Sequence, residues 1–483
     1  MTMGFARVDF VVLAAYLVLV TGIGCWFGSR LRDSRDYFLG GRNLPWWAVS
    51  LSIVATETSS LTFIGVPALA FASNMAFLQL TFGYFLARIV ISWLFLPAYY
   101  RGELFTAYQF LDLRFGGKTR SFASVIFLGT RVLADGVRLF ATAIPLAMIS
   151  GIGYAKAIAI ICIATVVYTY VGGIKAVVWM DVIQILIYLA GAGVAVLAIL
   201  HALPGGWSEV VAVGSASGKF DWFQPHFDLR APYTIWAGLI GGTFLTMASH
   251  GTDQLMVQRL LTCRHLRDGQ RALVGSGILI IAQFAFFLLI GVMLFAFFQR
   301  YPADPAPSRP DEVFPLFIVR HLPSGLSGLV VAAILAAAMS TLSGTLNSLA
   351  SSTVVDLYKP LSRRKLSPRQ ELLISRLVTL AWALVLVGVA ALASSWGNVL
   401  EVGLTIASFT YGSLLGIFLL GRLAKRATQT GALVGMAIGL ATMLGVSLTP
   451  IAWPWYVFIG ANVTFAAGLL ASGIDSRRLG SSG

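Results

Sequence analysis

The sequence contains few charged residues, few cysteines and few histidines. Only 11% of its 483 residues are Asp, Glu, Lys or Arg, and 58% are hydrophobic, whereas a soluble domain has about 25% charged residues. The three cysteines offer no disulfide framework. The five histidines are scattered, with no HExxH or paired-cysteine metal spacing, and no nucleophile–base pair is evident. These absences argue against a soluble protein, a disulfide-rich module and an enzyme.

The chain instead contains many long apolar stretches. A helix of about 20 apolar residues spans a lipid bilayer, and thirteen stretches of the chain meet that description. They lie near residues 8–28, 46–72, 76–99, 121–150, 154–172, 176–202, 232–258, 272–298, 325–356, 372–395, 398–421, 431–448 and 452–472. The sequence therefore predicts an all-α integral membrane protein with about 13 transmembrane helices and the lipid bilayer as its surroundings.

The net charge of +14 could indicate a nucleic-acid partner, but the placement of the basic residues indicates a membrane topology. With the N-terminus outside, most of the 34 Lys and Arg residues fall in segments predicted to be cytoplasmic, Arg259 among them. This is the positive-inside bias of membrane proteins. We therefore expect a multi-pass protein of the inner (plasma) membrane with its C-terminus in the cytoplasm, and no nucleic-acid partner.

Two of the apolar segments are interrupted by polar residues. Residues 55–60 read Ala-Thr-Glu-Thr-Ser-Ser, and residues 249–254 read Ser-His-Gly-Thr-Asp-Gln. A broken helix persists in a bilayer only where it lines a buried cavity, and such paired interruptions indicate the binding site of a secondary transporter. Glu57 lies in the first break. It is interpreted either as a functional acid or as a structural acid paired with an arginine, for which Arg88 is the candidate.

The segment 325–356 is rich in hydroxyl groups. On a helix, Ser340, Ser343 and Asn347 share one face. Neutral oxygens of this kind, facing free carbonyls of a broken helix, would suit a sodium ion, but small polar residues also serve ordinary helix packing. Asp181 has two open interpretations as well, a second cation ligand or an acid near the membrane surface.

Arg131, Asp135 and Arg138 are spaced by four and three residues, which places them on one helical face. Asp135 can neutralise one arginine and leave the other for an anionic substrate. The alternative is a purely structural triad.

Several longer stretches resemble the sodium:solute symporter family. They are Asp36–Arg42, Thr62–Pro67, Tyr168–Gln184, Asp253–Gln254 with Val257–Arg259, Ser340–Ser348 and Phe418–Gly421. The resemblance implies the leucine-transporter fold, with two inverted five-helix repeats. In a single transmembrane domain, the leading helix would be 8–28, the repeats 46–202 and 232–421, and the trailing pair 431–472.

The resemblance also implies where sodium, the coupling ion, binds. The main sodium site maps to the backbone carbonyls of Ala55, Thr58 and Ala337 and to the hydroxyls of Ser340 and Thr341.

A second sodium site, found in some members of the family, maps to Asp181, Ser340 and Ser343. Its remaining position is Gly344, which has no hydroxyl, so that site lacks one ligand.

For the solute, the positions that contact sugars in related carriers hold Thr81, Ile280 and Leu404, and the carboxylate-binding arginine of sialic-acid carriers falls at Ala134. No solute is therefore named. Glu57 suggests a polar or amine-bearing compound. The expected solute-binding residues are Glu57, Ser59, Thr62, Thr81, Asp253 and Arg138.

The resulting prediction is a sodium-coupled symporter that imports a small polar organic solute by alternating access. Members of the family take up sugars, sialic acid, amino acids, vitamins, monocarboxylates or iodide. The alternative is a membrane-embedded sensor or a channel without coupled transport. No obligate protein partner is inferred.

Overall fold

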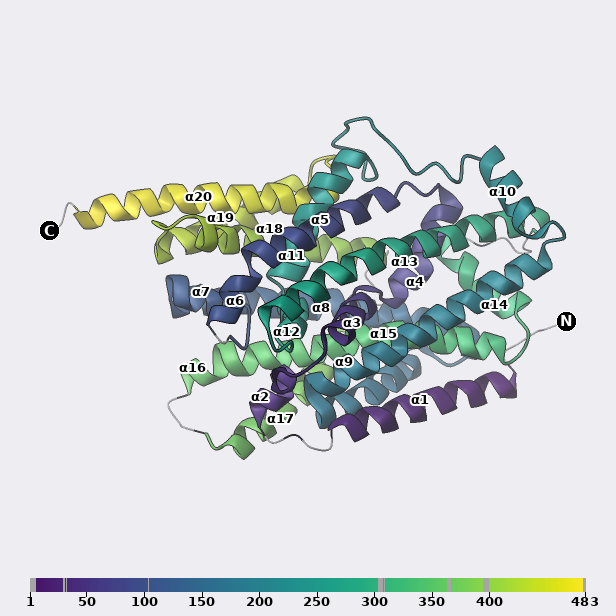
Figure 1. Ribbon diagram of the computed structural model, residues 1–483, viewed down its shortest axis with the longest axis horizontal. Coiled ribbons are helices and arrows are strands. Elements are labelled where there is room, and N and C mark those ends of the chain that lie inside the picture. Colours follow the sequence, from purple (N-terminus) through teal and green to yellow (C-terminus); the bar gives the residue numbers. More distant parts are fainter. Residues whose placement is uncertain are drawn as a thin grey trace.

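The computed structural model is a bundle of long helices lying roughly along one axis (Figure 1). It describes residues 6–480 except 29–30, 32, 103, 303–306, 308, 363–365 and 394–398. In this part of the chain the regular elements are all helical. The N- and C-termini lie at opposite ends of the bundle (Figure 1).

In the described residues, eleven helical elements precede the end of α10, and η2 and α11 follow in the next segment. They are α1 (Arg7–Gly28), α2 (Ser34–Leu39), η1 (Gly40–Arg42), α3 (Trp46–Glu57), α4 (Ser60–Ala72), α5 (Leu78–Leu94), α6 (Leu96–Arg101), α7 (Tyr108–Phe115), α8 (Gly117–Ser150), α9 (Tyr154–Ala202), α10 (Gly206–Ala216), η2 (Ala237–Gly242) and α11 (Thr243–Gly251). The remaining elements are α12 (Gln254–Leu260), α13 (Leu266–Arg300), η3 (Pro310–Glu312), α14 (Val313–His321), α15 (Leu326–Ser352), η4 (Thr353–Tyr358), α16 (Lys359–Leu361), α17 (Pro368–Ala393), α18 (Val399–Leu423), α19 (Gln429–Val446) and α20 (Pro454–Gly480).

The number of membrane spans depends on how the bent helices are counted. Among the described residues, eight helices are long and apolar enough to cross a membrane, or nine if α3 and α4 form one bent span. The 49-residue α9 would be about 74 Å long if straight, which exceeds a bilayer of about 40–45 Å. It instead turns at Gly173, so the two spans predicted there fall on one continuous element. The figure of thirteen spans stays a prediction.

The turn in α9 needs a glycine. Gly173 has a φ of 52° and a ψ of −154°, and a Cβ added to it would lie 2.4 Å from the carbonyl oxygen of Tyr37 in α2. The Tyr37 hydroxyl lies 3.2 Å from the Thr169 carbonyl and 3.0 Å from the Thr379 hydroxyl. The turn therefore brings α2 against α9 and α17.

The polar helix α15 runs through the protein interior. Every residue from 330 to 352 is buried, and α15 packs against α9, α1 and α8 (Figure 1). At its start, the carboxylate of Asp9 accepts hydrogen bonds of 2.7 Å from the backbone N–H groups of Gly325 and Gly328. The hydroxyl groups of α15 thus face protein rather than lipid.

Both interruptions predicted from the sequence are confirmed as helix breaks. α3 ends at Glu57 and α4 begins at Ser60, with a bend of 63° between them. α11 ends at Gly251 and α12 begins at Gln254. Asp253 caps α12 by accepting a 2.8 Å hydrogen bond from the Leu255 N–H.

The turn at Gly173 gives a first prediction. Gly173→Ala should lower the free energy of unfolding by about 1–3 kcal/mol, because the residue would be held at positive φ against the Tyr37 carbonyl. The measurement is the thermal unfolding midpoint of the protein in detergent. Gly193→Ala in the same helix is the matched control, because nothing lies within 4 Å of its added Cβ. Equal effects of the two substitutions would contradict the prediction.

Candidate functional site

A cavity of about 230 Å³ lies beside the break between α3 and α4. Its polar lining includes Glu57, Ser59 and Thr62 from the broken helix and Arg138 from α8. Most of the remaining wall is apolar or aromatic, and is formed by Leu69, Phe77, Tyr84, Tyr233, Met256, Phe284 and Trp453 among others. The cavity is therefore largely apolar with polar groups gathered near the helix break, as in binding sites for small organic molecules.

Four of the six expected solute-binding residues line this cavity, namely Glu57, Ser59, Thr62 and Arg138. The other two are not among the described residues that line it. The Thr81 hydroxyl donates a 2.7 Å hydrogen bond to the Leu78 carbonyl of its own helix. Asp253 is buried and bound to an arginine. The geometry therefore gives no support to a solute contact at either of these two positions.

Glu57 is paired with a buried arginine, as the sequence suggested. Its carboxylate accepts a hydrogen bond from Arg88 and lies 3.4 Å from His250 Nε2. Arg88 also donates to the Tyr84 carbonyl at 3.0 Å and to the Ser276 hydroxyl at 3.1 Å. The Glu57 side chain is 14% exposed. It thus forms part of the cavity wall while its negative charge is balanced by Arg88.

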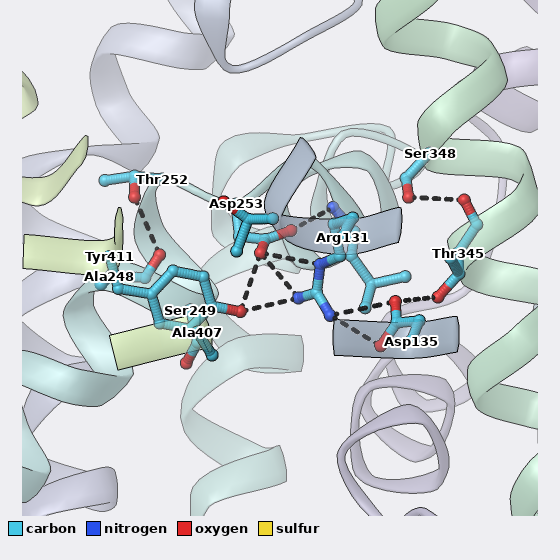
Figure 2. Close-up of polar contacts among 12 residues, drawn as sticks. Arg131, Asp135, Ala248, Ser249, Thr252, Asp253, Thr345, Ser348, Ala407 and Tyr411 are labelled. Atoms are coloured by element: carbon cyan, nitrogen blue, oxygen red, sulfur yellow. Dashed lines mark hydrogen bonds and ion pairs between the residues drawn. The ribbon is translucent and has the colours of Figure 1, made fainter. Parts of the chain in front are cut away.

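The arginine at the centre of α8 is the hub of a buried network, shown in Figure 2. Arg131 lies 2.6 and 3.0 Å from one oxygen of Asp253, 3.4 Å from Asp135 and 2.9 Å from the Tyr411 hydroxyl. Tyr411 donates to Asp253 at 3.0 Å, and Thr345 of α15 donates to Asp135 at 2.6 Å. The network ties α8 to the second helix break, to α18 and to α15.

Arg138 is bound less completely than Arg131. Its guanidinium lies 3.0 Å from Asp135, and its side chain remains 31% exposed. The structural interpretation of the triad thus fits Arg131, whereas Arg138 presents a cationic group to the cavity.

The main candidate sodium site is the point where the α3 break meets α15. A helix that ends at Glu57 leaves its last carbonyls without helical partners. The Thr341 hydroxyl lies 3.1 Å from the Thr56 carbonyl and 3.3 Å from the Ala337 carbonyl. The structure thus places the Thr341 hydroxyl between the carbonyl of Ala337 and that of Thr56 at the end of α3; Thr56 directly follows the predicted ligand Ala55 in the sequence.

The two other predicted ligands of this site make different contacts. The Thr58 hydroxyl donates to the Val54 carbonyl at 2.9 Å and accepts a bond from Gln283, which leaves its backbone carbonyl as the predicted ligand. The Ser340 hydroxyl donates to Asp181 at 2.6 Å.

A small hollow of about 20 Å³ adjoins Thr341 and is also lined by Ser59 and Arg138. This volume admits about one water molecule. Because Ser59 and Arg138 line the larger cavity too, the candidate ion site and the candidate solute site are neighbours.

The predicted second sodium site holds an arginine. Asp181 is fully buried, and one of its oxygens lies 3.1 Å from Nη2 of Arg259. The sequence predicted Arg259 in a cytoplasmic loop; the structure instead places it on α12, where it is fully buried. Ser343 donates to the Ser340 carbonyl at 3.0 Å.

Sequence reasoning did not assign several polar residues of the cavity lining to the site, among them His250 and Tyr411. His250 lies in the second polar interruption, which was a usable signal. Tyr411 lies in an apolar segment, where nothing in the sequence distinguishes it from a packing residue.

Residues 37–439 match the family described as Sodium:solute symporter family, and they make up most of the chain. The chain belongs to the sodium:solute symporter family. It is 30% identical to the sodium/sialic acid symporter SiaT of Proteus mirabilis, over 97% of this chain and 95% of that protein. It is 33% identical to the human sodium/iodide cotransporter, over 93% of this chain and 71% of that protein.

Solved structures agree with this family membership. The symporter superimposes with a TM-score of 0.90 on a substrate-bound, outward-open Na+-coupled sialic acid symporter, at 29% identity and over 97% of this chain and 98% of the other. Mhp1, a nucleobase-cation-symport-1 family transporter, matches with a TM-score of 0.57 at 13% identity, over 91% of this chain and 94% of the other, which shows the fold alone.

Several predictions from the sequence are thereby confirmed. The symporter is an all-α integral membrane protein of the leucine-transporter type, it couples transport to sodium by alternating access, and it is a carrier rather than an enzyme. It is a multi-pass membrane protein that takes a small-molecule solute.

The pairing of Glu57 with Arg88 gives a second prediction. Glu57→Gln should destabilise the symporter by about 3–5 kcal/mol, because it leaves the fully buried Arg88 without its counter-charge. The double substitution Glu57→Gln with Arg88→Met removes both charges, so it should recover most of that loss. Thermal unfolding in detergent measures both. A double variant no more stable than the single one would contradict the pairing.

Proposed function

We propose that this symporter imports a small organic anion with one carboxylate group, together with sodium. The observation that carries the proposal is the charge balance of the groups around the cavity. Among the described residues, the ion pairs in and beside the cavity contain equal numbers of arginines and carboxylates, in three clusters. The clusters are Glu57 with Arg88, Asp181 with Arg259, and Asp253, Arg131, Asp135 and Arg138 together.

Because the charges of these residues balance, sodium and solute bind most favourably when their own charges also sum to zero. Sodium alone adds one positive charge to a region where an unpaired charge costs at least about 2.5 kcal/mol. A solute with one negative charge restores neutrality beside the ion. Cooperative binding of sodium and solute then follows from electrostatics, because each lowers the cost of the other.

Arg138 is the residue that best fits the carboxylate. Its guanidinium has one carboxylate partner, Asp135, which Arg131 shares, and the side chain remains partly exposed in the cavity. Guanidinium and carboxylate groups form strong, directional hydrogen bonds. Ser59 and Thr62 supply further hydroxyl groups to the cavity lining, and the apolar surfaces suit a solute body with few hydroxyl groups. Because Arg88 balances Glu57, an amine on the solute has less support.

The relatives favour an anion as well. Sialic acid and iodide, for which two relatives are named, are both anions in neutral water. The cavity is small, about 230 Å³, and pockets for drug-sized ligands begin at about 300 Å³. A compact monocarboxylate therefore fits the proposal better than a larger sugar acid.

We assign sodium to the carbonyls of Ala55, Thr58 and Ala337 and the hydroxyls of Ser340 and Thr341. The contacts of Thr341 with α3 and within α15 support this assignment. Sodium bound there would link the free end of α3 to α15 and so order the wall that also holds Ser59.

The proposed topology has the N-terminus outside and the C-terminus in the cytoplasm of a plasma-membrane protein. The basic segments support this direction, and the termini at opposite ends of the bundle fit a placement on opposite sides of the membrane (Figure 1). The cavity lining includes Leu69, Phe77, Tyr233 and Trp453. Each of these residues is close in sequence to a loop that is predicted to lie outside. A cavity that reaches towards that side suits uptake from the exterior.

Uptake in proteoliposomes tests the solute class. With an inward sodium gradient, a monocarboxylate should accumulate more than hexoses, amino acids of no net charge or sialic acid, and an equal potassium gradient should drive none of it. Accumulation of a neutral solute in preference to every monocarboxylate would contradict the proposed class. Equal uptake on the potassium gradient would contradict sodium coupling.

Arg138→Gln gives a residue-level prediction. The loss of a charged hydrogen bond of about 1.5–3 kcal/mol should raise the KM for the carboxylate solute by about 10- to 100-fold. Ser249→Ala is the control, because Ser249 also lines the cavity but is neutral, and its KM should change less than about threefold. A normal KM in Arg138→Gln would remove Arg138 from the solute site.

A further inference from the structure

Three exposed aromatic rings lie on the connection between α10 and η2. Residues 217–234 of this connection form turns and irregular backbone, and in Figure 1 the segment leaves α10 and runs along the upper edge of the bundle. Trp222, Phe223 and Phe227 are 44%, 51% and 63% exposed. Apolar side chains gathered at a surface mark a contact with a partner or a membrane. These three residues are called the aromatic patch below.

The segment is fastened to the bundle along its length. At its start, Lys219 Nζ donates to two backbone carbonyls at the end of α4, at 2.7 and 2.8 Å. In its middle, the Gln224 N–H donates to the Gln79 side chain of α5 at 3.0 Å. Near its end, the Leu229 carbonyl accepts a 2.8 Å hydrogen bond from the Ala452 N–H. These contacts hold the aromatic patch in place on the surface.

One ring of the patch lies against the exposed face of α5. Trp222 packs on Phe82, with the ring centroids 6.1 Å apart. Leu86, Ile89 and Trp93 follow Phe82 at helical spacing and are exposed, so the four residues share one face of the helix. Because α5 is part of a helix long and apolar enough to cross a membrane, we expect this face to contact lipid.

A second ring lies beside the exposed residues of η2. The Phe227 ring centroid is 6.4 Å from that of Trp236 and 5.9 Å from that of Trp455. Trp236 and Leu239 are exposed, and the Trp236 indole N–H donates to the Pro225 carbonyl at 3.1 Å. None of the three patch residues is among the described residues that line the cavity. The aromatic patch therefore continues the lipid-facing surface of the bundle and does not cover the cavity.

Charged residues beside the rings limit how deep the patch can lie in the bilayer. Asp221, Asp228 and Arg230 are exposed on the same segment, and a charge is costly in the hydrocarbon core. Irregular backbone exposed to lipid does not occur in that core either. Aromatic rings next to charged groups are instead typical of the boundary between lipid headgroups and acyl chains, where Trp is enriched.

We propose that the aromatic patch docks onto the bilayer, with the rings of Trp222, Phe223 and Phe227 at the boundary between headgroups and acyl chains. The segment is then a membrane anchor and not a loop in water. The proposed topology places the anchor in the outer leaflet. Lys219 and Gln79 join the segment to α4 and α5, and both helices contribute residues to the cavity wall. The anchor thus fixes part of that wall relative to the bilayer.

Spin labels report whether the rings lie in lipid or in water. The full-length protein, with its three cysteines replaced by alanine, carries one nitroxide at Phe223→Cys or at Phe227→Cys. It is reconstituted into vesicles of phosphatidylethanolamine and phosphatidylglycerol. Power-saturation EPR then compares collisions with oxygen, which concentrates in lipid, with collisions with a nickel chelate, which stays in water.

Two further labels calibrate the measurement. Ile89→Cys lies on the exposed face of α5, and Ser217→Cys is exposed at the start of the segment, before the rings. The ratio of oxygen to nickel accessibility at Phe223→Cys and Phe227→Cys should be several-fold higher than at Ser217→Cys and should approach the ratio at Ile89→Cys.

Two results would overturn the anchor. A ratio at either patch position no higher than at Ser217→Cys would place that ring in water. Protection of the patch labels from both reagents would show that protein covers them, as in contact with a second copy of the chain. A reversed topology would move the anchor to the other leaflet without changing the ratios. The measurement involves neither solute nor sodium, so its failure would leave the proposed function intact.

Discussion

A charge in the middle of a membrane protein is stable only when an opposite charge lies beside it, and this constraint shapes the interior of the molecule. Removal of one partner from a buried ion pair costs about 3–5 kcal/mol. Arg88, Arg131 and Arg259 each lie against a carboxylate on a different helix. Since an unpaired state is costly, these contacts fix how the broken helices meet α5, α8 and α9.

The two helix breaks bring backbone carbonyls and paired side chains into the binding region. The first break exposes backbone carbonyls beside Thr341. The second break brings Asp253 against Arg131 and Arg259 against Asp181. Side chains from both breaks therefore surround one region in which ion and solute groups are neighbours. A movement of either broken helix changes the contacts of both sites, which is the physical requirement for coupled transport.

Much of this could be predicted from the sequence, because the lipid environment leaves strong patterns. Polar residues inside apolar runs identified both breaks, and a lone membrane arginine identified the partner of Glu57. Hydroxyl groups at helical spacing identified α15. The division into two inverted repeats stays a prediction.

The remaining features depend on tertiary contacts that no local pattern contains. Arg259 follows a helix break and precedes a basic segment, so its sequence context resembles that of a cytoplasmic residue. Its burial depends on Gly344, 85 positions further along the chain. Asp253 resembles a cavity residue in sequence because it lies in a break, yet Arg131 and Tyr411 bind its carboxylate.

The paired charges beside the cavity also determine how the membrane potential acts on the carrier. One sodium ion with one monoanion moves no net charge, so the membrane potential, worth about 2.3 kcal/mol per charge at 100 mV, adds nothing. Because each arginine beside the cavity lies against a carboxylate, the protein groups there add no net charge of their own, and the membrane potential acts only on the ions and the solute that move.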